Sequence, residues 1–238
     1  MRLYLLRLGT VRPRGPLAEV PVPGYLIRHP GGTNILVDTG AARNMVGDES
    51  AAFAVGEDEH VSAQLGRLGL NAEDIDIVVC THLHPDHSGS NDLFPQARFV
   101  VQRRELEEAR ASTEMKYTWM REHWDAPGLT YDQVDGDVEL LPGVELIDSH
   151  GHSAGHQSVL VRLANSGPLL ITGDAVPSAD HTDPESRPVS DVFDHDGEAV
   201  RASTRKLMNL AARENALVVH SHDQQQWGTL RIAPEFYD

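Results

Sequence analysis

The segment Thr81-His82-Leu83-His84-Pro85-Asp86-His87-Ser88-Gly89 places three histidines and one aspartate within six residues. It directly follows residues 75–80, a β-branched and apolar run that predicts a buried strand. Imidazole and carboxylate groups are the donors that a borderline-soft divalent metal prefers. In an extended chain the first two histidines point the same way, whereas the aspartate and the third histidine belong to the turn that follows. This spacing favours two adjacent metal sites over a single one.

Three further donors stand just past other predicted strands. They are His152 after residues 144–148, Asp174 after residues 169–172, and His222 after residues 216–220. Each is a weak signal alone, because a lone polar residue after a strand commonly starts a turn. Together they put metal donors where strand ends converge in a sheet protein.

Strands and helices alternate along the whole chain. A Pro-Gly-Gly turn at residues 30–32 predicts a hairpin between strands at 24–29 and 34–38. The other predicted strands cover residues 3–8, 98–102, 144–148, 158–163, 169–172 and 216–220, and the predicted helices cover residues 61–70, 103–110 and 199–214. This order predicts sheets covered by helices in one domain, residues 1–238. Residues 175–198 lack periodicity and predict a long functional loop.

Composition excludes several classes of protein. The 238 residues include 20 Lys and Arg against 36 Asp and Glu, a formal charge of −16. This balance disfavours nucleic acid and anionic membrane surfaces as partners, because both need a basic face. The single cysteine, Cys80, allows no intrachain disulfide. With no stretch that resembles a signal peptide or a membrane span, we expect a cytoplasmic protein.

The donor pattern resembles the metallo-β-lactamase-fold hydrolases with two metal ions. Residues 35–40, 142–146 and 151–158 are similar to the N-acyl homoserine lactonase branch, as are residues 102–107 and 234–237. The resemblance runs from about Leu3 to Tyr237 and so covers nearly the whole chain. It implies an α/β protein with a four-layer αββα sandwich and the site at one edge, between the two sheets.

The resemblance also implies a role for each donor. One ion takes His82, His84 and His152, the other takes Asp86, His87 and His222, and Asp174 bridges them. Two cations about 3.5–4 Å apart, here expected to be zinc, can activate water and polarise a carbonyl. Asp86 can also pass a proton to a departing alkoxide as a general acid. In similar proteins an aspartate at the place of Asp38 lies near a ligand histidine and fixes its tautomer, although this residue can equally start the turn before Thr39.

One position departs from the lactonase branch. Those lactonases commonly carry a tyrosine three residues after the bridging aspartate, where this chain has Pro177. Ser221 likewise replaces a glycine often seen before the last histidine. Candidates to replace the missing hydroxyl are Ser178, His181 and Tyr117, of which we favour His181 as a catalytic donor because it is a competent donor near neutral pH.

These observations predict an enzyme, a dinuclear-metal hydrolase that opens a lactone ring. N-acyl homoserine lactone is the leading substrate, which makes the protein a quorum-quenching lactonase. The alternatives are the same chemistry on another ester, thioester, β-lactam or phosphodiester, and a non-catalytic protein with structural or sensing metals. Residues 109–128 contain several apolar side chains that fit a lid, a contact in a homodimer, or both.

Overall fold

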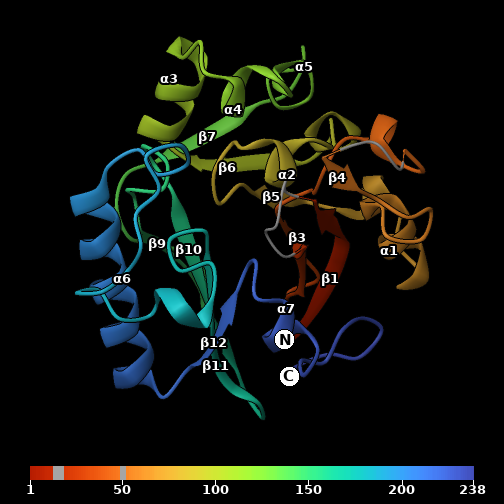
Figure 1. Ribbon diagram of the computed structural model, residues 1–238. Coiled ribbons are helices and arrows are strands. Elements are labelled where there is room, and N and C mark those ends of the chain that lie inside the picture. The colour runs from red at the N-terminus through yellow and green to blue at the C-terminus, as the bar shows by residue number, and fades with distance from the viewer. Residues whose placement is uncertain (13–18, 49–51) are drawn as a thin grey trace.

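The computed structural model describes residues 1–12, 19–48 and 52–238, and two β-sheets form its centre (Figure 1). Within these residues one sheet has the strand order β4-β1-β2-β3-β5-β6-β7 and the other has the order β12-β11-β10-β9-β8. The strands of the first sheet are β1 (Arg2–Val11), β2 (Val20–Arg28), β3 (Asn34–Val37), β4 (Phe53–Ala54), β5 (Ile77–Val79), β6 (Arg98–Gln102) and β7 (Tyr131–Val134). Those of the second are β8 (Val138–Leu141), β9 (Val144–Asp148), β10 (Gln157–Leu163), β11 (Gly167–Gly173) and β12 (Leu217–His220).

Strand β1 illustrates a strand whose two faces are both buried. Its side chains alternate between two cores: Leu3 and Leu5 pack between the sheets, and Tyr4, Leu6 and Leu8 pack under the helices on the other side. A strand buried on both faces is apolar at successive positions rather than at every second one. The continuous apolar run at the start of the chain therefore reflects a strand that is buried on both faces.

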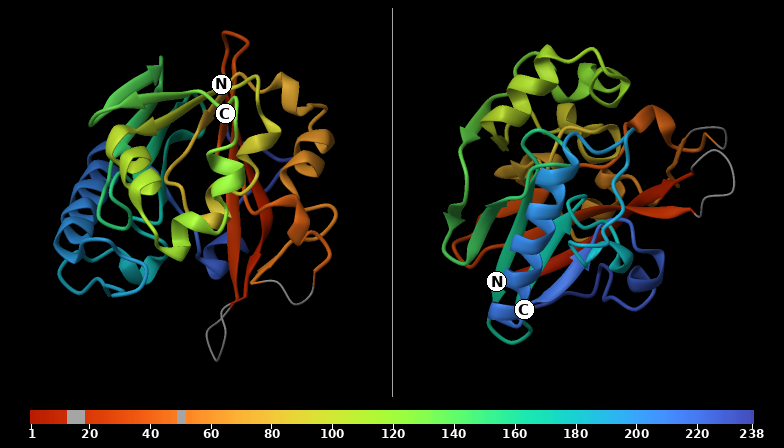
Figure 2. Two further views of the ribbon diagram at one scale, coloured as in Figure 1. Left: turned by 90° about the horizontal axis from the view of Figure 1, so that it is seen from above. Right: turned by 60° about the vertical axis from the view of Figure 1, so that its left-hand side comes forward.

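Helices cover the outer face of each sheet (Figures 1 and 2). The helices are α1 (Val61–Arg67), α2 (Pro85–Ser88), α3 (Arg103–Ala111), α4 (Met115–Thr118), α5 (Arg121–Trp124), α6 (Gly197–Glu214) and α7 (Gln224–Trp227). Helix α6 packs Leu207 and Leu210 against Leu160 and Leu170 of the second sheet, while α1 and α3 pack on the first. The order helix, sheet, sheet, helix confirms the predicted four-layer α/β sandwich. In the part of the chain that the structure describes, none of the helices combines the length and apolar character needed to cross a bilayer.

The strands that precede the later metal donors point the same way. Strand β10 runs antiparallel to both β9 and β11, and β12 runs parallel to β11. Strands β9, β11 and β12 therefore share a direction, and the segments after them emerge at one edge of the second sheet. Ligand sites of α/β proteins commonly lie at such carboxyl ends, which is where His152, Asp174 and His222 stand.

The predicted elements are present, with shifted ends. Strands β2 and β3 pair antiparallel, as the hairpin pattern predicts, with Tyr25 opposite Val37. The helix predicted for residues 61–70 ends at Arg67, ahead of Gly69, which adopts a left-handed conformation (φ 74°). No strand is predicted for β7 or β8, because each has only four residues and their side chains are half-buried or exposed, which leaves no clear pattern.

Candidate metal centre

Seven donor side chains gather at the edge between the two sheets, and all seven were singled out in the sequence. Ligand atoms lie within 4.8 Å of one another in two separate groups of three: His82, His84 and His152, and Asp86, His87 and His222. A third set, His82, His87 and Asp174, meets the same criterion and links the two groups. Asp174 lies between the groups, since its Oδ1 is 3.4 Å from His87 Nε2 and its Oδ2 is 3.4 Å from His152 Nε2. The arrangement offers two adjacent sites with one shared carboxylate.

The segment after β5 turns sharply into the short helix α2. Pro85 occupies the first helical position, where its missing N–H leaves no hydrogen bond unmade. Ser88 Oγ donates to the carbonyl oxygen of His84 at 3.0 Å and closes the turn. A Cβ on Gly89 would stand 2.7 Å from Ala42 N, so only glycine permits this close packing. The turn brings Asp86 and His87 into the same cluster as the two histidines before it.

Oxygen acceptors hold the Nδ1 atoms of three histidines in the cluster. The pairs are His87 with Asp38 Oδ2 at 2.8 Å, His152 with Asp194 Oδ1 at 3.1 Å, and His222 with the carbonyl of Pro21 at 2.8 Å. An oxygen without a proton accepts one from Nδ1, so Nε2 keeps its lone pair. In each case that Nε2 faces the cluster, as a metal ligand must.

Asp38 contacts the cluster from the end of β3. Its Oδ1 accepts a hydrogen bond from Thr81 N at 2.7 Å, and its Oδ2 accepts one from Thr81 Oγ1 at 2.7 Å as well as from His87. Thr81 Oγ1 in turn lies 3.0 Å from His82 Nδ1 and accepts its proton. Asp38 adopts a left-handed conformation (φ 58°) directly after β3, so an unusual backbone conformation and the contact with a histidine occur in the same residue.

The carboxylates of the cluster stabilise positive charge at its centre, as their effect on the histidine pKa values indicates. Burial alone would lower the pKa of His87, but Asp174, Asp86 and Asp38 outweigh it and raise that pKa well above its ordinary value. Against the same effect of burial, Asp174 and Asp86 raise the pKa of His222. Burial lowers the pKa of His82 and that of His84, so both rings are neutral and able to coordinate.

Several atoms that face the centre have no hydrogen-bond partner among the described residues. They include His82 Nε2, His87 Nε2 and Asp174 Oδ1, all of them buried. Buried polar atoms are nearly always paired, so unpaired ones that converge on one place call for a bound group. Nitrogen and carboxylate donors in groups of three with a shared fourth suit divalent ions such as zinc. The residues therefore fit a pair of ions.

Glu105 of α3 joins the two histidine-bearing loops; it lies in the segment 102–107 that resembles the lactonase branch, but no role is predicted for it from the sequence. The side chain is fully buried. Its Oε1 accepts from Leu83 N at 3.0 Å, and its Oε2 accepts from Ser153 Oγ at 2.7 Å and from Gly155 N at 2.8 Å. A Cβ on Gly155 would lie 2.4 Å from Glu105 N, so glycine permits the approach. Leu83 lies between two donor histidines, and Ser153 directly follows a third.

A directional hydrogen-bond chain positions Asp174. Asp174 N donates to His156 Nε2 at 3.0 Å, which leaves the ring proton on Nδ1, 2.9 Å from Ser149 Oγ. Ser149 Oγ lies 2.8 Å from Ser158 Oγ, which donates to the carbonyl of Thr172 at 2.9 Å. Burial lowers the pKa of His156 to about 3, so the ring stays neutral and the chain keeps its direction. His156 thus acts on the backbone of Asp174.

The candidate replacements for the missing tyrosine lie in two places. His181 is half-buried in a 3-10 turn, with its Nδ1 2.8 Å from Ser178 Oγ, and lies outside the donor groups described above. Pro177 offers only its carbonyl, which accepts from His222 N at 2.9 Å. The buried ring of Tyr117 stands edge-on to His84 with the ring centroids 5.3 Å apart. The role of His181 stays a prediction.

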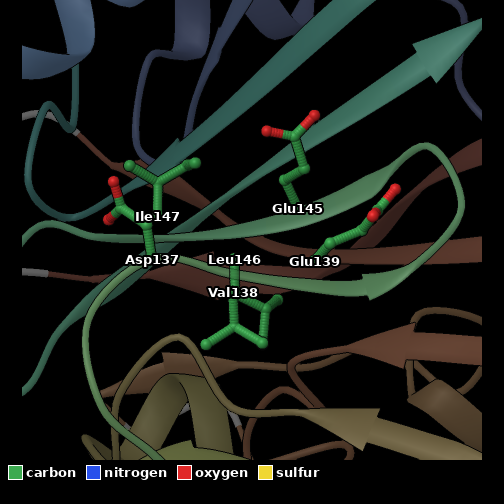
Figure 3. Close-up of a pocket in the computed structure, with 6 residues that line it drawn as sticks. All are labelled: Asp137, Val138, Glu139, Glu145, Leu146 and Ile147. Atoms are coloured by element: carbon green, nitrogen blue, oxygen red, sulfur yellow. The ribbon is translucent and has the colours of Figure 1, made fainter.

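A shallow pocket of about 280 Å³ lies elsewhere, on strands β8 and β9 (Figure 3). Its lining comprises Asp137, Val138, Glu139, Glu145, Leu146 and Ile147. None of the seven donors lines it, and it offers carboxylates without a histidine or a cation. We assign it no part in the chemistry.

The fold and the donor set together define a class of protein. Residues 17–222 match the family model of the metallo-beta-lactamase superfamily, and the chain belongs to that superfamily. The resemblance to its N-acyl homoserine lactonase branch is also confirmed. The N-acyl homoserine lactonase AttM of Azorhizobium caulinodans is 35% identical over 266 aligned positions, covering 100% of this chain and 99% of the relative.

Two further relatives extend this comparison. An N-acyl homoserine lactonase of a Bacillus species is 33% identical, covering 93% of this chain and 89% of its own length. The solved structure of an N-acyl homoserine lactone hydrolase, with the product N-hexanoyl-L-homoserine bound at its catalytic metal center, superposes with a TM-score of 0.87. That protein is 29% identical, and the match covers 99% of this chain and 98% of the other.

Proposed function

We propose that the protein is a metal-dependent hydrolase that opens the ring of N-acyl homoserine lactones, a quorum-quenching lactonase. One observation carries the proposal: a chain similar to lactonases along its full length keeps a complete set of seven donors in one cluster. A non-catalytic protein is disfavoured because a structural zinc site is typically closed by four protein ligands. Here two adjacent groups of three donors share one carboxylate, Asp174, which is the pattern of hydrolytic two-metal sites rather than of an isolated structural site.

We propose that His82, His84 and His152 hold one ion, that Asp86, His87 and His222 hold the other, and that Asp174 bridges them. Both ions are proposed to be zinc. Bound divalent ions supply the electrophilic activation of a carbonyl and lower the pKa of an attacking water. In both groups the ligand atoms lie within 4.8 Å of one another, and the same holds for His82, His87 and Asp174, a set that spans the two groups.

We propose that Asp86 also transfers the proton to the leaving group. Its Oδ2 lies 3.7 Å from both His87 Nε2 and His222 Nε2, and its side chain is 13% exposed. The side chain thus borders both the cluster and solvent, where a substrate must enter. Ring opening breaks the ester C–O bond and leaves an alkoxide, to which Asp86 delivers the proton taken from the attacking water.

The test is hydrolysis of N-hexanoyl-L-homoserine lactone by the metal-loaded protein, with N-hexanoyl-L-homoserine detected by mass spectrometry. Chelation should abolish the activity, and added zinc should restore it. His152→Ala should also abolish it, whereas His150→Ala should not, because His150 pairs with Asp148 outside the donor groups. Faster turnover of a thioester, β-lactam or phosphodiester in a parallel panel would reject the lactone assignment.

Homodimer formation, the cytoplasmic location and the single domain stay predictions. In the proposed lid or dimer contact, residues 109–128, Met115 and Trp119 are exposed while Tyr117, Met120 and Trp124 are buried. The buried side chains belong to the core on the outer face of the first sheet, whereas much of the segment is exposed. A lactone as partner is supported by the product bound in a related hydrolase.

A further inference from the structure

Asp194 reaches the metal centre from a segment without helix or strand. Residues 187–196 precede α6, and Asp194 Oδ1 lies 3.1 Å from His152 Nδ1. The side chain of Asp194 is only 6% exposed. A buried carboxylate needs partners for both oxygens, because an unpaired charge is costly to bury.

The second oxygen of Asp194 is held by a buried arginine. Asp194 Oδ2 accepts from Ser190 N at 2.9 Å and from Arg187 Nη1 at 3.3 Å. Arg187 is 2% exposed, and it also donates from Nη1 to the carbonyl of Pro188 at 2.7 Å and from Nε to that of Ala175 at 3.2 Å. Because a guanidinium stays charged, its burial here depends on Asp194 as the neutralising partner.

The backbone of the same segment is bonded to the turn that carries His152. His195 N donates to the carbonyl of Gly151 at 2.8 Å and to that of His152 at 3.0 Å, and Asp196 N donates to Gly151 at 2.9 Å. Gly151 has a positive φ of 127°, and a Cβ there would lie 2.2 Å from Val200 N. The segment and the turn therefore pack as one unit, with Asp194 facing the ring of His152.

Each donor group thus contains one histidine held by a buried carboxylate, His87 by Asp38 and His152 by Asp194. We propose that Asp194, clamped by Arg187, is a positioning residue that keeps the proton of His152 on Nδ1 and aims Nε2 at the metal centre. Asp194 thereby sets the affinity for the ion held by His152. The inference rests on the two-ion centre of the proposed function and not on the identity of the substrate.

The test is the release of ions from the metal-loaded full chain as a competing chelator is raised, with bound ions per chain counted by elemental analysis. Asp194→Ala should release one of the two ions at about 10–100-fold lower chelator concentration, the usual effect of losing such a partner. The second ion should leave as in the wild type. Asp194→Asn keeps the shape of the side chain and should also release the same ion at a lower chelator concentration. This variant provides the test if the alanine variant does not fold.

Asp196→Asn is the matched control. Asp196 caps α6 by accepting from Glu198 N and Ala199 N, and asparagine caps a helix equally well. This control removes the same charge two residues away without touching His152. The inference is overturned if Asp194→Asn releases its ions at the same chelator concentration as the wild type, or if both of its ions leave at an equally lowered concentration. It is also overturned if Asp196→Asn lowers the concentration for release as much as Asp194→Asn does. A protein that releases its ions as expected but opens no lactone would instead reject the proposed function alone.

Discussion

Replacing Glu105 with glutamine should destabilise the protein strongly, although the change alters one atom. The carboxylate accepts three hydrogen bonds, from Leu83 N, Ser153 Oγ and Gly155 N. A glutamine can keep its oxygen toward Ser153 and Gly155, but its amide nitrogen then faces Leu83 N, and two donors confront each other. Losing a bond to a charged group costs about 1.5–3 kcal/mol, and an unsatisfied buried donor costs about 1–3 kcal/mol.

These two costs overlap, and a neutral side chain is easier to bury, so we expect a net loss of about 2–4 kcal/mol in the free energy of unfolding. Urea unfolding of the metal-loaded protein, followed by tryptophan fluorescence at fixed metal concentration, measures it. Glu107→Gln is the matched control, because Glu107 is exposed on the same helix, and its midpoint should equal that of the wild type. Equal midpoints for the two variants would refute the reasoning.

The remaining predictions concern the metal centre and catalysis. Elemental analysis of protein purified without chelator should give about two ions per chain, because two groups share Asp174; one ion or none after supplementation would contradict it. Asp86→Asn should lower kcat by about 100-fold or more, with smaller losses on lactones that have better leaving groups; equal losses across the series would leave Asp86 as a ligand only. His181→Ala should lower kcat/KM on a lactone with both ions still bound. If this change is silent, and Ser178→Ala and Tyr117→Phe are too, no protein donor replaces the missing tyrosine.

The sequence predicted the metal donors better than the residues that hold them. The seven side chains follow apolar strands in a recognisable order, so strand ends and spacing predicted that they lie together, as they do. Glu105 and Asp194 carry no such signal: Glu105 stands among other charged residues of α3, and Asp194 lies in an aperiodic segment. Their roles arise from contacts between residues far apart in the chain, such as Asp194 with His152, which local patterns do not contain.

The same limit applies to the fold. The apolar run of β1 and the hairpin of β2 and β3 were predictable because burial on a pleated strand dictates residue type. Strands β7 and β8 were not, because at these ends of the two sheets pairing with one neighbour stabilises a strand whose side chains remain half exposed. Four residues are too few to establish a pattern of alternation.

The donors come from both sheets, with His82 following a strand of the first and His222 following a strand of the second. Ions held between them would cross-link the two sheets at one edge, outside the apolar interface between the sheets. Metal binding is then thermodynamically linked to folding, so the melting temperature rises with free metal concentration. Removal of the ions by a chelator should therefore lower the local stability of the edge that carries the donors. Amide hydrogens around residues 81–89 and 149–156 should exchange faster with solvent, while those of the central strands stay protected.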